Sequence, residues 1–245
     1  MKALVFAAGV GSRLKPWTNS HPKALVDVAG KPMLQRVIEN IISAGIDDII
    51  INVHHFGEQI IEFIANNHFE ADIRISDERK QLLDTGGGLR KVIPWLNDES
   101  VLIHNADILT DYDLKNLVKS HISSSNDATL LVAPRQSSRR LVFSKNMLMK
   151  GWINIDSGEV KPAGLKSSSD DRLLSFNGIH IFSSSLYKSL LDYQPAETSF
   201  SIIDFYVSKA SLELIGGELL PQNCRWYDVG KPQTLEEARK SFYVE

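Results

Sequence analysis

Two adjacent stretches near the start of the chain decide the fold: residues 6–18 read FAAGVGSRLKPWT, and residues 21–32 read HPKALVDVAGKP. The apolar run Ala3–Ala7 comes directly before two glycines, so it predicts a buried strand that ends in a glycine-rich turn. Because Gly9 and Gly11 have no side chain, the backbone N–H groups of the turn can approach a phosphate closely. The stretch therefore predicts a strand followed by an anion-binding loop.

Two cations in the same region strengthen this prediction. Arg13 supplies a planar, permanently charged guanidinium that suits phosphate oxygens, and Lys23 adds a point-like positive charge. A dinucleotide-binding fingerprint is excluded because no third glycine follows Gly11 at the required spacing, and the P-loop pattern is absent as well. On local physics alone, a structural turn with solvated cations stays open as the alternative.

Short apolar runs alternate with helical patterns through the first half of the chain. We expect strands at Ala3–Ala7, Asp48–Val53, Asp72–Ser76, Val101–His104 and Ala128–Ala133. We expect helices between them at Pro32–Ala44, Glu58–Asn66, Gly86–Leu96 and Asp111–Ser120, the last one capped by Asp111. This alternation predicts an α/β fold with a mostly parallel sheet and helices on both faces. Ligands of such sheets bind at the carboxyl ends of the strands.

The second half of the chain is more mixed. Residues 136–171 predict a small β-rich excursion, which we interpret as a lid. After it we expect strands at Leu173–Ser183 and Trp226–Val229, and helices at Ser184–Asp192, Ile202–Lys209 and Pro232–Phe242. With no internal repeat and no linker in the sequence, residues 1–245 are expected to form a single domain.

Composition excludes several classes of protein. The chain has 245 residues, of which 27 are basic and 30 acidic, for a net charge of -3, so it does not resemble a nucleic-acid binder. The single cysteine, Cys224, cannot form an internal disulfide, which fits a reducing compartment. No segment has the length of a membrane span or the pattern of a signal peptide. We therefore expect a cytoplasmic protein without membrane or nucleic-acid partners.

Two acidic residues follow predicted strands. Asp107 ends the segment Asn105-Ala106-Asp107, and Asp228 precedes Gly230 by two positions. Two carboxylates from distant positions can hold one Mg²⁺, with triphosphate oxygens and waters completing its octahedron. Isolated acids of this kind are more often helix caps or solvated turn residues, so local physics leaves both readings open.

Together these residues resemble the signature of the sugar-1-phosphate nucleotidyltransferases, which is close to LxAAGxGxRLxPxT…PKxLxxxxGKP. The resemblance continues at Thr85–Gly88, Asn105–Asp107 and Trp226–Gly230, and covers nearly the whole chain. The nearest subgroup is the short bacterial enzymes similar to N-acetylmuramate-1-phosphate uridylyltransferase, followed by short mannose-1-phosphate guanylyltransferase-like proteins. The resemblance implies the nucleotide-diphospho-sugar transferase fold, a Rossmann-like mixed sheet with helices on both faces.

The resemblance also implies a role for each matching residue. The catalytic residues are Arg13 and Lys23, and the metal ligands for Mg²⁺ are Asp107 and Asp228. The nucleotide-binding residues are Ala8, Gly9, Gly11, Ser12, Leu82, Thr85 and Gly86. The sugar-binding residues are Asn105, Asn177 and Gly178. The chain departs from the family at Ala106, where most members have glycine, and at Val160-Lys161-Pro162, where many have a sugar-contacting Glu-Lys-Pro.

The implied reaction joins a nucleoside triphosphate (NTP) to a sugar 1-phosphate and releases pyrophosphate. We expect UTP with N-acetylmuramate 1-phosphate or a related amino-sugar phosphate, and the alternative is GTP with mannose 1-phosphate or a related hexose phosphate. A non-catalytic nucleotide-sugar sensor on the same scaffold is an alternative of another class. The partners are therefore an NTP and a sugar 1-phosphate, and the sequence leaves homo-oligomerisation open.

Overall fold

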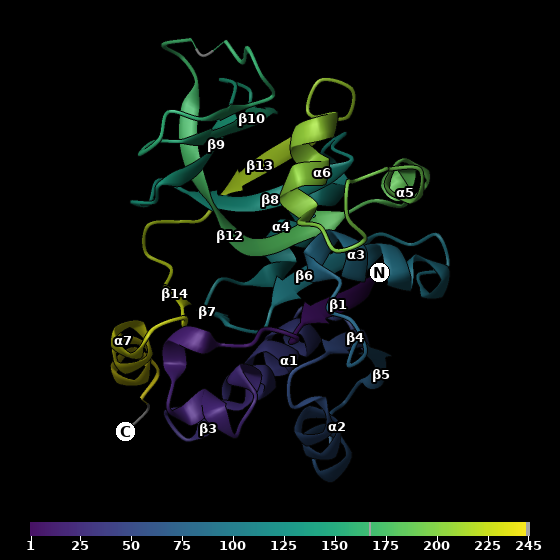
Figure 1. Cartoon of the computed structure of the whole chain (residues 1–245), viewed down its shortest axis with the longest axis vertical. Coiled ribbons are helices and arrows are strands. Elements are labelled where there is room, and N and C mark those ends of the chain that lie inside the picture. The colour runs from purple at the N-terminus through teal and green to yellow at the C-terminus, as the bar shows by residue number, and fades with distance from the viewer. Residues whose placement is uncertain (167, 244–245) are drawn as a thin grey trace. The chain divides into compact units, whose positions relative to one another are not determined.

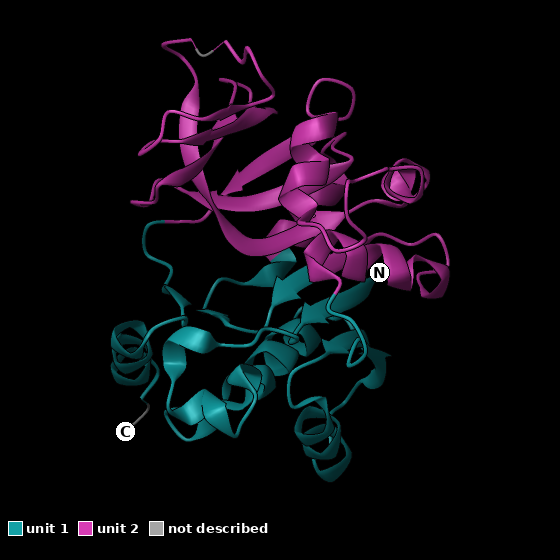
Figure 2. Ribbon diagram, viewed as in Figure 1, with its two compact units in different colours: residues 1–82, 103–115, 222–245 teal, residues 83–102, 116–221 magenta. Residues whose placement is uncertain are grey.

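The computed structural model describes residues 1–166 and 168–243. Residue 167, inside the predicted β-rich excursion, lies outside the described part of the chain. The structure divides into two compact units (Figure 2). Unit 1 comprises residues 1–82, 103–115 and 222–245, and unit 2 comprises residues 83–102 and 116–221. Each unit is therefore built from segments that are far apart in the sequence.

Unit 1 contains most of the predicted βα alternation (Figure 1). Its strands are β1 (Lys2–Phe6), β2 (Asp27–Val28), β3 (Lys31–Pro32), β4 (Asp48–Val53), β5 (Asp72–Asp77), β6 (Val101–Asn105, which begins at the unit boundary), β7 (Ile108–Thr110) and β14 (Trp226–Asp228). Its helices are α1 (Met33–Ser43), α2 (Gly57–Asn66) and α7 (Pro232–Phe242), with 3₁₀ turns η1 (Ser12–Leu14), η2 (Trp17–Asn19) and η3 (Lys23–Leu25).

The sheet of unit 1 has the strand order β6-β1-β4-β5. Strands β1, β4 and β5 run parallel to one another, with Ala3 opposite Ile49 and Ile49 opposite Ile73. Near-continuous apolar runs such as Ala3–Val5 are fully buried here, as expected for parallel strands that are covered on both faces. Helix α1 buries one stripe, made of Met33, Leu34, Val37, Ile38 and Ile41. Hydrophobic burial therefore fixes where β1 ends, and so where the glycine loop begins.

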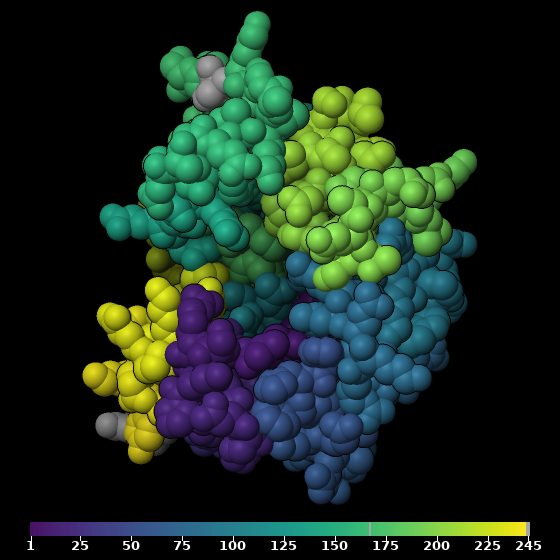
Figure 3. All heavy atoms as spheres, in the orientation of Figure 1, coloured from purple at the N-terminus to yellow at the C-terminus, as the bar shows by residue number. Residues whose placement is uncertain are grey.

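Two small antiparallel pairs complete unit 1. Strand β2 pairs with β3, and β14 pairs with β7, which places Asp228 opposite Ile108. The first and last segments of the chain lie side by side, as the purple and yellow spheres of Figure 3 show. Arg239 Nε of α7 donates to the backbone oxygen of Asp27 at 3.1 Å. The pairing of β14 with β7 therefore places Asp228 beside Ile108, the residue that directly follows Asp107.

Unit 2 is mixed and largely antiparallel. Its strands are β8 (Ala128–Ala133), β9 (Arg139–Phe143), β10 (Met149–Asn154), β11 (Val160–Lys161), β12 (Arg172–Phe182) and β13 (Ile215–Leu219). Its helices are α3 (Asp84–Val92), α4 (Leu114–Ser123, which begins at the unit boundary), α5 (Tyr187–Leu191) and α6 (Ile202–Lys209), with 3₁₀ turns η4 (Ile93–Trp95) and η5 (Ser184–Leu186). Strand β12 runs antiparallel to both β8 and β9, whereas β13 runs parallel to β8.

The structure corrects one predicted cap. Helix α4 begins at Leu114 and not at Asp111. The carboxylate of Asp113 accepts the N–H of Lys115 at 2.9 Å, as a capping side chain does. Asp111 instead accepts the backbone N–H and the Nε of Arg225, both at 2.7 Å. Among the residues described, no helix has the length and apolar character needed to cross a membrane.

Candidate active site

The glycine loop begins where β1 ends, as predicted. Gly11 has a φ of +65°, in the left-handed region that favours glycine. A Cβ at this position would lie 2.9 Å from both Lys23 Cβ and Thr18 Cγ2. The hydroxyl of Thr18 also donates to the Gly11 carbonyl at 2.9 Å. The tight loop therefore requires a glycine at position 11, and it brings Lys23 against the loop.

Two other positions of the loop, Gly9 and Ser12, are accessible to a ligand. Ala8 is buried and Gly9 and Ser12 are exposed, and a Cβ built on Gly9 would meet no atom within 4 Å. Space beside an exposed backbone is what close approach by a phosphate needs. Whether these residues bind a nucleotide stays a prediction.

Arg13 lies next to the second predicted acid. A Cβ built on Gly230 would fall 2.6 Å from Arg13 Nη2 and 2.9 Å from Asp228 Oδ1. Both groups therefore crowd the same face of Gly230, and any side chain there would displace one of them. This explains the glycine two positions after Asp228 by close packing. It also places a permanently charged guanidinium next to a carboxylate.

Lys23 forms an ion pair with the carboxylate of Asp107. The side chain of Lys23 is only 9% exposed, so its charge is largely shielded from water and needs this partner. The backbone carbonyl of Asp107 accepts the N–H of Val229 at 2.9 Å, which ties Asp107 to the segment that contains Asp228. The structure therefore brings Arg13, Lys23, Asp107 and Asp228 together in unit 1.

The donor set at this place fits Mg²⁺. In the described part of the chain, no group of three or more His, Cys, Asp or Glu side chains is arranged to hold a metal ion. Magnesium, however, is commonly bound by one or two carboxylates together with substrate phosphates and waters. Asp107 and Asp228 provide two such carboxylates, each beside a cation that attracts phosphate. A magnesium site completed by the substrate is consistent with this arrangement.

The backbone around Asp107 is held from two directions. The N–H of Ala106 donates to the carbonyl of Phe6, the last residue of β1, at 3.0 Å. The carbonyl of Asn105 accepts the Nδ1–H of His104 at 2.9 Å. Burial lowers the pKa of His104 to about 4, so the imidazole is neutral at pH 7. Asn105 itself is half-buried, and its contact with sugar stays a prediction.

The helix predicted to begin at Gly86 starts two residues earlier, among the residues that the resemblance assigns to nucleotide binding. Leu82 is half-buried at the end of a unit 1 segment, whereas helix α3 begins at Asp84 and includes all three glycines. The N–H of Gly86 donates to the carbonyl of Phe200 at 2.8 Å, so this amide already has a backbone partner. The hydroxyl of Thr85 accepts the N–H of Ile202 at 3.0 Å.

The glycines of α3 are explained by close packing. A Cβ on Gly86 would collide with the ring of Phe200, and a Cβ on Gly87 would lie 2.8 Å from the Thr198 carbonyl. The segment before α6 therefore packs directly on the backbone of α3.

Asn177 and Gly178 lie at an irregularity of β12. The register between β12 and β8 shifts between Phe176 and His180, and Gly178 has a φ of +78°. Asn177 is completely buried, and its Oδ1 accepts two hydrogen bonds from Arg135, from Nε at 3.1 Å and from Nη2 at 2.6 Å. Sequence reasoning missed Arg135. Its position two residues after the buried strand β8 was the available signal.

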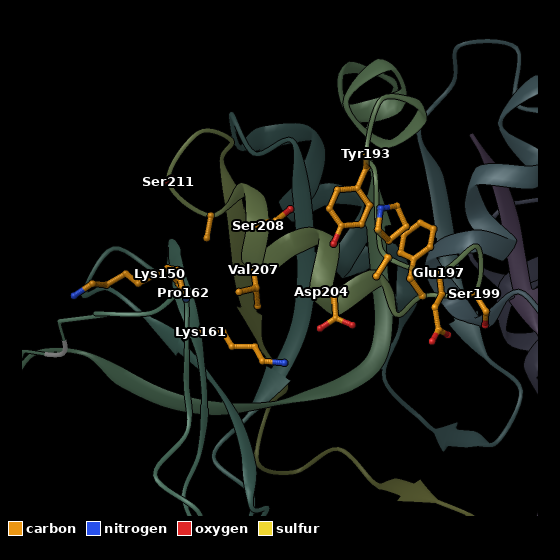
Figure 4. Close-up of a pocket in the computed structure, with 14 residues that line it drawn as sticks. Lys150, Lys161, Pro162, Tyr193, Glu197, Ser199, Asp204, Val207, Ser208 and Ser211 are labelled. Carbon is orange, nitrogen blue, oxygen red and sulfur yellow. The ribbon is translucent and has the colours of Figure 1, made fainter.

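Unit 2 also contains a cavity of about 570 Å³ (Figure 4). Lys161, at the end of β11, and the following Pro162 line it, and Asp204 lines it from α6. Tyr193 and Glu197 belong to the segment before α6 and line it as well. Lys161 is the lysine that resembles the family's Glu-Lys-Pro. Cationic, acidic and phenolic groups here surround one space, which suits a polar ligand.

Comparison with known proteins identifies the family. The family model described as nucleotidyl transferase matches residues 2–243. The chain belongs to the nucleotidyl transferase family. The N-acetylmuramate alpha-1-phosphate uridylyltransferase of Caulobacter vibrioides is 37% identical over 108 residues, which cover 43% of this chain and 45% of that protein. The mannose-1-phosphate guanylyltransferase 1 of Arabidopsis thaliana is 32% identical over 136 residues, covering 54% and 38%. The match thus spans less than half the length of these curated relatives.

Solved structures of the same fold cover almost the whole chain. HddC from Yersinia pseudotuberculosis, complexed with GMP-PN, has a TM-score of 0.76 at 20% identity and is matched over 98% of this chain and 99% of its own. The UDP-glucose pyrophosphorylase from Acinetobacter baumanii has a TM-score of 0.80 at 18% identity, over 98% and 92%. The predicted fold class, a mixed sheet with helices in the nucleotide-diphospho-sugar transferase arrangement, is confirmed.

Proposed function

We propose that the protein transfers a nucleoside monophosphate from an NTP to a sugar 1-phosphate, forming an NDP-sugar and pyrophosphate. One observation supports this most directly: Arg13, Lys23, Asp107 and Asp228 come from distant positions and lie together in unit 1. Two cations and two carboxylates around a glycine loop provide the charges that a triphosphate and a metal ion require.

In the proposed reaction, a phosphate oxygen of the sugar 1-phosphate attacks the α-phosphorus of the NTP. The bond from the α-phosphorus to the bridging oxygen breaks, and pyrophosphate leaves with that oxygen. No residue needs to form a covalent intermediate, so binding and orientation of the two substrates provide most of the catalysis. Cys224, which is half-buried, is not needed as a nucleophile.

Each charged residue has a distinct task in this proposal. The guanidinium of Arg13 stabilises negative charge that develops on the departing pyrophosphate. The ammonium of Lys23 attracts phosphate oxygens and, through its ion pair, holds the carboxylate of Asp107 in place. Asp107 and Asp228 would hold Mg²⁺, which supplies positive charge that neutralises the triphosphate and assists departure of pyrophosphate.

We further propose that the cavity of unit 2 accepts the sugar, although Asn105, Asn177 and Gly178, to which the resemblance assigns sugar binding, do not line it. Lys161 projects into it and Asp204 lies across the same space, as Figure 4 shows, whereas Lys150 is bound to Asp171 at 2.6 Å. An amine and a carboxylate can donate to and accept from sugar hydroxyls. Replacing Lys161 by alanine should therefore raise KM for the sugar 1-phosphate and leave KM for the NTP unchanged.

The favoured substrates are UTP and N-acetylmuramate 1-phosphate, in line with the uridylyltransferase relative. The second candidate, GTP with mannose 1-phosphate, is favoured by the guanylyltransferase relative. Pyrophosphate release, measured with Mg²⁺ across four NTPs and the 1-phosphates of N-acetylmuramate, N-acetylglucosamine, mannose and glucose, tests both pairs. Release with one pair supports the transferase and names its substrates. If folded protein binds nucleotide-sugar but releases no pyrophosphate with any pair, the sensor alternative replaces it.

A further inference from the structure

A buried polar chain lies behind the glycine loop, on residues that the reaction does not use. Asn52, on β4 beside Phe6, and Glu78, just after β5, are each only 2% exposed. The Oδ1 of Asn52 accepts the N–H of Ala7 at 2.7 Å, and its Nδ2 donates to Glu78 Oε1 at 3.2 Å. Ala7 is the residue between the end of β1 and the loop. The chain therefore links the start of the loop to a buried carboxylate.

The two bonds determine how the Asn52 amide is oriented. A flipped amide would set its NH₂ against the N–H of Ala7 and its oxygen against the carboxylate of Glu78, so both contacts would become repulsive. Glu78 is itself fixed, because its N–H donates to the Val53 carbonyl at 2.8 Å and its carbonyl accepts the Nδ1–H of His54 at 2.7 Å. Glu78 thus selects the amide orientation that binds Ala7.

The position of Ala7 affects both loops of the site. The preceding carbonyl, that of Phe6, accepts the N–H of Ala106 in the segment that contains Asp107. On the other side, the Ala7 N–H lies just beyond the end of β1 and donates to the side chain of Asn52. A buried N–H without a partner is costly, so loss of the Asn52 oxygen would shift the backbone at this point.

We propose that Asn52 and Glu78 are positioning residues for NTP binding: they hold the Ala7 amide and thereby fix the glycine loop in its phosphate-binding conformation. The proposal rests on the proposed function only in that the loop binds an NTP. It assigns no contact with substrate to either residue. Loss of this positioning should weaken binding of the NTP and leave binding of the sugar 1-phosphate unchanged.

The test exchanges the two polar groups. Asn52→Asp keeps the acceptor for Ala7 but sets a second carboxylate against Glu78, so KM for the NTP should rise roughly tenfold, equivalent to about 1.4 kcal/mol, while KM for the sugar 1-phosphate stays unchanged. The double variant Asn52→Asp/Glu78→Gln reverses the direction of one hydrogen bond and restores the pairing. Its KM for the NTP should return to within about twofold of the wild type.

Glu78→Gln alone is the matched control, since a glutamine oxygen can still accept from Asn52. A double variant as impaired as Asn52→Asp, or equal rises in both KM values, would overturn the proposal. Calorimetric titration with the NTP gives a readout that does not need turnover. If the wild type binds NTP but releases no pyrophosphate, the proposed function fails and the binding ratios still test Asn52. If the wild type binds no NTP, the positioning role fails too.

Discussion

At the scale of single residues, the site depends on charges that shield one another in the absence of substrate. Lys23 is nearly buried and is bound to Asp107, so removing either charge leaves the other without its partner. Substitutions that keep the size of the side chain are therefore more informative than truncations. An Asp-to-Asn exchange removes the charge and leaves the volume nearly unchanged.

Asp107→Asn should lower kcat by roughly 10² to 10³-fold, the range found for loss of one electrostatic stabiliser. The physical reason is that the carboxylate beside Lys23, which we propose as a metal ligand, loses its charge. Steady-state pyrophosphate release measures the effect, and circular dichroism confirms that the variant is folded. Asp170→Asn, at an exposed position, is the matched control and should keep full activity. Near wild-type turnover of folded Asp107→Asn would rule out the metal-binding role.

Gly9→Ala separates binding from folding. A methyl group at this position meets no atom of the protein within 4 Å, so the free energy of unfolding should stay within about 0.5 kcal/mol of the wild type. The same methyl group would occupy space next to the exposed loop backbone and should raise KM for the NTP. Denaturant unfolding and initial rates measure the two effects. An unchanged KM would show that phosphate does not approach the loop at Gly9.

At the scale of elements, regular hydrophobic patterns predicted helices and strands well. Strands β4 and β8 and helices α6 and α7 have the predicted bounds, since the strands are nearly continuous apolar runs, α6 follows the capping residue Ser201, and α7 starts at Pro232. Strand β13 was missed because Gly216 and Gly217 lower strand propensity. The structure explains both glycines, since added Cβ atoms would collide with Asn126 and approach Phe143.

Some residues of the candidate site could likewise be predicted from the sequence, and others could not. The grouping of Arg13, Lys23, Asp107 and Asp228 could be anticipated because a family pattern spans them. For Arg135 the sequence offered only its position just after β8, and for the Asn52–Glu78 pair it offered no signal, because their roles arise from contacts between segments far apart in sequence. Gly86 shows the opposite case. The sequence marks this glycine, but the structure explains it by the close approach of Phe200, whose carbonyl also accepts the Gly86 N–H.

Helix α6, which provides Asp204 to the cavity, offers a stability test. Ser201 is its N-cap, and its Oγ accepts the N–H of Ile203 at 3.2 Å. Ser201→Ala should lower the free energy of unfolding by about 1 kcal/mol, the usual loss when a capping oxygen is removed. Urea denaturation measures this loss, and the exposed Ser211→Ala serves as control. Equal stability of the two variants would argue against the cap.

At the scale of the whole molecule, a buried histidine links stability to pH. His180 lies in the core of unit 2, and neither ring nitrogen has a hydrogen-bond partner among the described residues. Burial lowers the pKa of His180 from 6.5 to about 3. Between these values the unfolded chain binds a proton that the folded protein does not. The free energy of unfolding therefore falls as the pH falls through this window.

His180→Leu removes this proton-linked loss. Between about pH 7.5 and about pH 5.5, the free energy of unfolding of the wild type should fall by about 1.4 kcal/mol more than that of the variant. This is the contribution of one histidine that is protonated only in the unfolded chain. Denaturant titrations at both pH values measure it, and other histidines cancel in the comparison. A pH-independent difference would show that His180 becomes charged in the folded state.

The division of unit 1 into three segments has a consequence for synthesis on the ribosome. Strand β7 is made by residue 110, but its partner β14 begins at Trp226. At a typical rate of translation, roughly 5 to 20 s separate the two. During this interval β7 has an unpaired edge, and Asp107 lacks the Val229 amide that later anchors it. The nascent chain therefore has the loop proposed to bind phosphate well before it has both carboxylates of the proposed metal-binding pair.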